Sequence, residues 1–127
     1  MAGLSTHVLD TARGRPAAGL AIELYRIAGD SRDLIRRATT NADGRVDGLM
    51  IEAKDMRVGT YELVFAVADY FRAAGVALAD PPYLDLVPVR FAVSDVAAHY
   101  HVPLLVSPRS EEHTSELQSR FGISYAV

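Results

Sequence analysis

Three histidines and one arginine are the residues of this sequence whose types and spacing could support chemistry. His99 and His101 are two positions apart in a β-prone stretch, so their side chains would share one face of a strand. A histidine there can act as a general base, because its pKa lies close to neutral pH. Arg45 directly follows a tight turn, where a guanidinium can hold a planar carbonyl or anion through two parallel hydrogen bonds. His7 lies near the N-terminus.

Each of these residues also has a simpler structural interpretation. A histidine in a β-protein is more often a hydrogen-bonding structural residue than a catalyst. His99 and His101 together with the distant His7 would also permit a zinc site, although no fourth ligand is evident. Arg45 alone would usually be a solvated turn residue. Any prediction of function therefore depends on the combination of these residues.

Short strand-like segments separated by turns would have to position the three histidines and Arg45. Residues 20–25 alternate apolar and polar side chains, which is typical of a half-buried strand. Asp43 and Gly44 predict a tight turn after the next strand. Pro16 predicts a loop without regular pairing at 14–19. The remaining expected strands are 34–40, 61–68, 87–93 and 99–106.

One short helix is expected over residues 70–74. Asp69 would cap its N-terminus, and Gly75 would end it. Several short strands at this spacing with a single helical turn predict an all-β sandwich.

Composition narrows the class of protein. The chain has 127 residues, enough for one domain, and its net charge is −3 without a basic stripe, which argues against a nucleic-acid partner. It contains no cysteine, so disulfides and thiolate sites are excluded. Residues 63–68 form the longest mostly apolar stretch, which is too short to span a membrane. The N-terminus has no secretory pattern, so we expect a cytoplasmic protein without a membrane partner.

Three motifs closely resemble the 5-hydroxyisourate hydrolases, the enzymatic branch of the transthyretin family. They are LSTHVLDTARGRPAAGL near the N-terminus, NADGR in the middle and HYHVPLLVSP near residue 108. The resemblance covers residues 4–108. It implies a transthyretin-like β-sandwich of two antiparallel sheets that assembles as a homotetramer. It also implies hydrolysis of the purine derivative 5-hydroxyisourate to 2-oxo-4-hydroxy-4-carboxy-5-ureidoimidazoline in urate degradation, with no cofactor and no metal.

The same resemblance assigns the site residues. By motif, His7, Arg45 and His101 would line the active cleft as catalytic and substrate-binding residues. His99 shares a strand face with His101, but the motif favours His101. The alternatives are a transthyretin-like carrier of small ligands and a non-catalytic interaction domain. The hydrolase hypothesis requires His7, Arg45 and His101 to converge on one cleft.

The C-terminal segment departs from the family pattern. The family closes with a tyrosine-rich strand and Tyr-Arg-Gly-Ser, whereas residues 109–119 read RSEEHTSELQS, the translation of a common sequencing adapter. This predicts a domain of residues 1–108 that lacks its last strand, followed by a non-native tail over 109–127. The edge beside residues 99–106 should then be uncovered, and assembly and activity should suffer. Locally, the tail favours a helix from Ser110, because acidic residues follow it.

Overall fold

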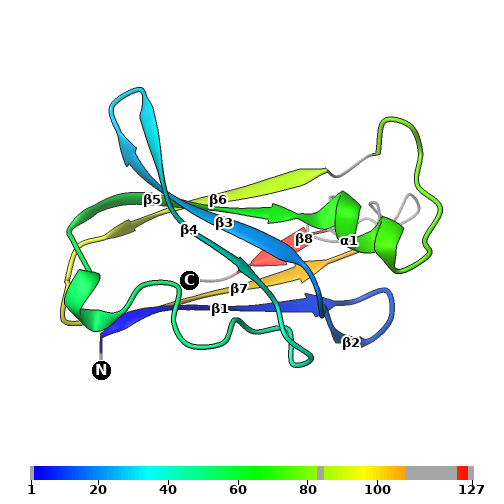
Figure 1. Ribbon diagram of the computed structural model, residues 1–127, viewed down its shortest axis with the longest axis horizontal. Helices are drawn as coiled ribbons and strands as arrows, with labels where there is room; N and C mark the ends of the chain where they lie inside the picture. The colour runs from blue at the N-terminus through cyan, green and yellow to red at the C-terminus, as the bar shows by residue number, and fades with distance from the viewer. Residues whose placement is uncertain (1, 83–84, 108–122, 126–127) are drawn as a thin grey trace.

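The computed structural model describes residues 2–82, 85–107 and 123–125, the last three in backbone only. Two four-stranded sheets face each other, and one short helix lies at one end (Figure 1). The first sheet has the order β2-β1-β7-β8, and the second has the order β4-β3-β5-β6. The predicted all-β sandwich with a short helix is confirmed.

The strands of the two sheets have the following bounds. The first sheet contains β1 (Gly3–Asp10), β2 (Arg15–Pro16), β7 (His99–Val106) and β8 (Ile123–Tyr125). The second contains β3 (Ala21–Ala28), β4 (Ser31–Thr39), β5 (Gly59–Ala66) and β6 (Leu86–Val93). A short 3-10 turn, η1 (Ala53–Asp55), precedes β5.

Alternating side chains divide each sheet into a core face and an outer face. In β1, Leu4 and Val8 are fully buried, and Val102 and Leu104 of β7 lie beside them. Each such fully buried apolar side chain contributes about 1.5–3 kcal/mol relative to an exposed one. The odd-numbered residues of β1 and β7 between these core positions therefore point to the outer face.

The pairing of β1 with β7 is parallel, whereas antiparallel sheets were expected. The two strands run side by side from Gly3 opposite His99 to Asp10 opposite Val106. The whole second sheet lies between them in the chain, so no hairpin constrains their direction. This register decides which polar residues meet on the outer face.

The prediction that Pro16 excludes regular pairing is wrong. Residues 15 and 16 form the two-residue strand β2, in which Pro16 lies opposite Leu9. A proline is tolerated there because β2 is the edge of the sheet and the missing amide proton is not needed.

The helix begins earlier than the sequence indicated. The α1 helix (Val67–Ala73) follows β5 directly, so the predicted strand end at Ala68 is wrong. Strand pairing stops at Ala66, and the next two amides, those of Val67 and Ala68, donate to the carbonyl of Asp85. A residue far along the chain therefore satisfies the first turn of the helix, which no local pattern could reveal.

The predicted capping role of Asp69 is also wrong. Asp69 lies in the first turn of α1 and pairs with Arg72 at 3.2 Å. The predicted end of the helix is confirmed, because Gly75 follows Ala74 with φ +85°.

A buried hydrogen bond joins α1 to the first sheet. The Tyr70 hydroxyl donates to Oδ2 of Asp10 at 2.7 Å, and the amide of Arg13 donates to Oδ1 at 3.1 Å. Asp10 is fully buried. Burial and the neighbouring Asp10 carboxylate raise the pKa of Tyr70. This bond fixes the end of β1 relative to the helix.

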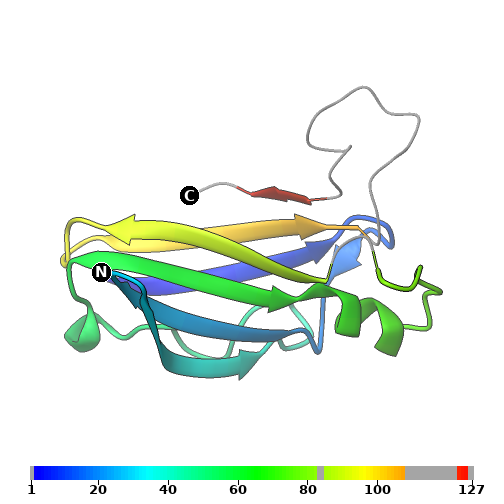
Figure 2. The same ribbon diagram turned by 90° about the horizontal axis from the view of Figure 1, so that it is seen from above.

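The edge of β7 is partly covered, contrary to the expectation of an open edge. Residues 123–125 form β8, which pairs antiparallel with Leu104–Val106 (Figure 2). Free backbone amides and carbonyls at a sheet edge accept any nearby β-prone segment. The helix predicted from Ser110 lies outside the described residues. No helix among the described residues is long and apolar enough to cross a membrane.

Candidate functional site

The outer face of β1 and β7 gathers a serine and three histidines. His7 and Ser5 come from β1, and His99 and His101 come from β7. The parallel register places Ser5 directly opposite His101. His7 is one strand repeat further along β1, opposite Pro103, so His7 and His101 are diagonal neighbours across the pair.

The turn before Arg45 is docked against the free side of β1. The predicted turn is confirmed, and the Asn41 side-chain oxygen accepts from the amides of Asp43 and Arg45 at 2.9 and 3.2 Å. Val8 donates its amide to the carbonyl of Gly44 at 2.8 Å.

Gly44 is required at this contact. It has φ +75°, and a Cβ there would lie 2.3 Å from the carbonyl oxygen of Val8. Only a residue without a side chain allows the turn to approach β1 this closely. The approach brings Arg45 into an isolated antiparallel bridge with His7. Residues paired in this way project their side chains to the same side.

His7 is held by the backbone of the same turn. Its Nε2 lies 2.9 Å from the carbonyl oxygen of Asp43. A carbonyl only accepts, so Nε2 carries the proton and donates it. In the neutral ring, Nδ1 is then the nitrogen with the free lone pair.

His101 is held by Ser5. Nδ1 of His101 lies 2.8 Å from Oγ of Ser5, and Nε2 of His99 lies 3.0 Å from the same oxygen. Ser5 therefore bridges two imidazoles, and Nε2 of His101 is the ring nitrogen turned away from this bridge.

The electrostatics of the face favour a neutral His101. Burial lowers its pKa below the ordinary value of 6.5, and the nearby Arg45 guanidinium and the neighbouring imidazoles of His7 and His99 lower it further. A neutral imidazole at pH 7 has a lone pair available to accept a proton. The register of β1 with β7 and the bridge between His7 and Arg45 place all four residues on this face.

The structure thus brings the three predicted site residues together on one face. His7 and Arg45 are bridged partners, and His101 interacts electrostatically with both. Sequence reasoning missed Ser5 and the Asp43 carbonyl, which orient the two histidines. Ser5 shares the strand parity of His7, but only the β1–β7 register shows that it meets His101. The described residues contain no group of three or more metal-binding side chains that could hold a metal ion.

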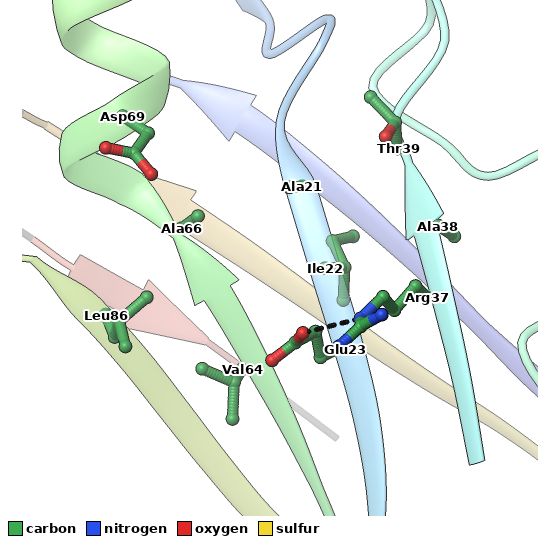
Figure 3. A pocket seen from close by; sticks show the side chains of 10 residues that line it. All are labelled: Ala21, Ile22, Glu23, Arg37, Ala38, Thr39, Val64, Ala66, Asp69 and Leu86. Atoms are coloured by element: carbon green, nitrogen blue, oxygen red, sulfur yellow. Dashed lines mark hydrogen bonds and ion pairs between the residues drawn. The ribbon is translucent and has the colours of Figure 1, made fainter. Parts of the chain in front are cut away.

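A groove of about 450 Å³ lies elsewhere, on the outer face of the second sheet (Figure 3). Its charged residues are Glu23, Arg37 and Asp69, and Glu23 pairs with Arg37 at 2.9 Å. Alanine and other apolar side chains such as Val64 and Leu86 form much of the rest. No histidine is among the residues that line this groove, and its two carboxylates are both paired, Glu23 with Arg37 and Asp69 with Arg72.

Comparison with known proteins gives consistent matches. A family model described as HIUase/Transthyretin family matches residues 4–111. The Rhizobium meliloti (strain 1021) protein 5-hydroxyisourate hydrolase 2 is 63% identical over 105 residues, which are 83% of this chain and 88% of that protein. The 5-hydroxyisourate hydrolase of Deinococcus radiodurans is 56% identical over 108 residues, which are 85% and 90% of the two chains.

Solved structures agree with these matches. Klebsiella pneumoniae 5-hydroxyisourate hydrolase superimposes with a TM-score of 0.73 at 26% identity, covering 99% of this chain and 97% of that chain. Sea bream transthyretin in complex with thyroxine gives a TM-score of 0.76 at 24% identity, covering 98% and 94%. The second likeness concerns the fold alone.

Proposed function

Because the chain belongs to the HIUase/Transthyretin family, we propose that it is a hydrolase that opens the six-membered ring of 5-hydroxyisourate. The product would be 2-oxo-4-hydroxy-4-carboxy-5-ureidoimidazoline, as a step of urate degradation. The observation that carries this proposal is the gathering of His7, Arg45 and His101 on one sheet face. A carrier of apolar ligands has no use for such a set of polar groups.

Arg45 holds and polarises the substrate in this mechanism. The acylureide edge of 5-hydroxyisourate presents carbonyl oxygens that match the parallel donors of a guanidinium. Arg45 is exposed and forms a bridge with His7, so it can reach a ligand lying on the β1–β7 face. As water adds to the acyl carbon, the guanidinium stabilises the negative charge that develops on the oxygen.

His101 is the general base in our proposal. Its lowered pKa keeps the ring neutral at pH 7, and Nε2 is the nitrogen away from Ser5. Nε2 takes a proton from the attacking water, whose oxygen bonds to the acyl carbon. The acyl carbon–nitrogen bond then breaks, and the leaving nitrogen takes the proton that Nε2 of His101 accepted from water. His7, fixed by the Asp43 carbonyl, orients the water or the leaving nitrogen.

We extend the proposal to the setting of the enzyme. The protein acts in the cytoplasm, and with a family-type last strand in place of residues 109–127 it assembles as a homotetramer whose sites lie between dimers. Light scattering coupled to size exclusion tests the assembly, and a monomer would contradict it.

Residues 109–127, in our proposal, are not part of the native domain. The two relatives align over 105 and 108 residues, and RSEEHTSELQS reproduces an adapter translation. The codons of residues 109–119 test this proposal, because nucleotides other than those of the adapter would refute it.

Turnover of freshly formed 5-hydroxyisourate tests the hydrolase proposal. The substrate is generated by enzymatic oxidation of urate, and its decay is followed by absorbance. His101→Gln should lower kcat by roughly 10²–10⁴-fold, the usual contribution of a general base. Ser31→Ala at the exposed start of β4 is the control and should retain the rate. The chain is assayed beside one in which a family-type last strand replaces residues 109–127, and failure of both to exceed the uncatalysed decay would overturn the proposal.

A further inference from the structure

Ser5 bridges two histidines on the β1–β7 face and does not itself contact the substrate in the proposed mechanism. Ser5 contacts Nδ1 of His101 at 2.8 Å and Nε2 of His99 at 3.0 Å. Ser5 and His101 are half-buried, whereas His99 is exposed. A hydroxyl group has one proton to donate and two lone pairs that accept. The two contacts are therefore coupled: when Ser5 donates to one imidazole, it can only accept from the other.

The Ser5 hydroxyl can accept from both rings, but when it donates to one of them, two arrangements satisfy both contacts with neutral rings. In one, His101 donates from Nδ1 to Ser5, and Ser5 donates to Nε2 of His99. In the other, every proton is reversed, so that His99 donates to Ser5 and Ser5 donates to His101. The first leaves Nε2 of His101 as a free lone pair, and the second places a proton on it. Only the first arrangement provides a base on the side of the ring away from Ser5.

We propose that Ser5 and His99 are positioning residues that hold His101 in the Nδ1–H tautomer, with its Nε2 lone pair free toward the substrate. This inference rests on the proposed hydrolase function, and it adds two residues that act through His101. His99 supplies the acceptor that keeps the Ser5 proton pointing away from His101. Because His99 is exposed, its own Nδ1–H is satisfied by water.

The hydrogen bonds that run from His101 through Ser5 to His99 also stabilise His101 after it has accepted a proton. The imidazolium keeps its Nδ1–H bond to Ser5, and the hydroxyl remains polarised by its bond to His99. Hydrogen bonds aligned in this way strengthen one another. The Arg45 guanidinium is the permanent positive charge near His101, and it opposes protonation of the ring. The Ser5 oxygen accepts from Nδ1–H of His101, and this bond therefore stabilises the ring most when the ring becomes positively charged.

Nitrogen-15 chemical shifts of the imidazole rings test the tautomer in the full chain without any assay of activity. Wild-type His101 should have a protonated Nδ1 and an unprotonated Nε2 at pH 7.5. Ser5→Ala should give a mixture of tautomers. His99→Leu, at an exposed position, should shift His101 toward the Nε2–H form, because Ser5 can then donate to Nδ1.

Kinetics supply the second readout. Ser5→Ala should lower kcat by roughly 10-fold with little change in KM, less than the about 10²–10⁴-fold expected for loss of the base itself. Ser5→Thr retains a hydroxyl and should recover most of the wild-type kcat and tautomer. Ser31→Ala is the matched control for loss of a hydroxyl, and it should change neither readout.

The two readouts separate failure of this inference from failure of the proposed function. A wild-type His101 in the Nε2–H form, or Ser5→Ala and His99→Leu variants that keep the wild-type tautomer and kcat, would overturn the inference in a chain that still hydrolyses 5-hydroxyisourate. Absence of turnover both in this chain and in one with a family-type last strand restored would refute the function, whatever tautomer the spectra report.

Discussion

Replacing Tyr70 by phenylalanine should measure how strongly the helix is tied to the first sheet. Tyr70→Phe removes one hydroxyl and keeps the ring that packs edge-on against Phe71, at 5.0 Å between centroids. The lost bond is the 2.7 Å contact to Asp10, whose side chain is fully buried. Asp10 would keep only the 3.1 Å bond from the Arg13 amide among the side-chain contacts described.

The expected cost is about 2 kcal/mol, because a hydrogen bond to a charged group contributes roughly 1.5–3 kcal/mol and the buried carboxylate is left short of a partner. This corresponds to an increase of about 30-fold in the unfolding equilibrium constant. For a domain of this size, the melting temperature should fall by roughly 6–12 °C. Urea denaturation followed by circular dichroism measures the free energy of unfolding directly.

Tyr25→Phe is the matched control. The Tyr25 hydroxyl also donates to a carboxylate at 2.7 Å, but the acceptor is Glu23, whose side chain is 34% exposed. Water replaces the lost bond there, so the change should stay within about 0.5 kcal/mol. If Tyr70→Phe destabilised the protein no more than Tyr25→Phe, the argument from burial would be refuted.

The pH dependence of this effect has a definite sign. The pKa of Tyr70 is raised in the folded protein, so its protonated form is favoured by folding. The corresponding stability is fully present below the unfolded pKa near 10 and is lost as pH rises through the higher folded pKa. The difference between wild type and Tyr70→Phe should therefore be constant from pH 7 to 9 and shrink above about 10.

Three further predictions concern the site. Arg45→Met should lower kcat/KM by roughly 10²–10³-fold. By removing a positive charge it should also raise the pKa of His101, which moves the acid limb of the rate profile to higher pH. Arg37→Met is the control and should change neither quantity. Without a substitution, the midpoint of the acid limb should lie below pH 6.5, because a base with a lowered pKa stays neutral to lower pH. A midpoint above 6.5 would contradict this. Gly44→Ala should separate the turn from Val8 and remove most activity in a chain that still folds, and full activity would show that the close approach is not needed.

Local patterns were sufficient to predict most of the strands. Alternation in residues 20–25 predicted β3, and β7 has the bounds that its sequence indicated. The turn at Asp43 and Gly44 was also predicted, because Asp and Gly tolerate the left-handed backbone that tight turns require, and Gly44 adopts it with φ +75°. Local sequence determines these features, so a single sequence suffices to predict them.

Features that depend on distant partners could not be predicted in this way. The start of α1 depends on the Asp85 carbonyl, and the parallel pairing of β1 with β7 depends on the path of the chain through the second sheet. The contact between Ser5 and His101 follows from that pairing. It could therefore not be predicted, although Ser5 lies within one of the three motifs identified in the sequence. His7, Arg45 and His101 were predicted only because their motifs resemble a family.

The location of a bound purine analogue tests the central claim most directly. Urate keeps the ureide edge of 5-hydroxyisourate, and its position in a crystal of this chain distinguishes the two outer faces. We predict that it binds on the β1–β7 face, within hydrogen-bond distance of Arg45 and in contact with His7 and His101. Binding in the groove of Glu23 and Arg37, with the β1–β7 face empty, would contradict the account.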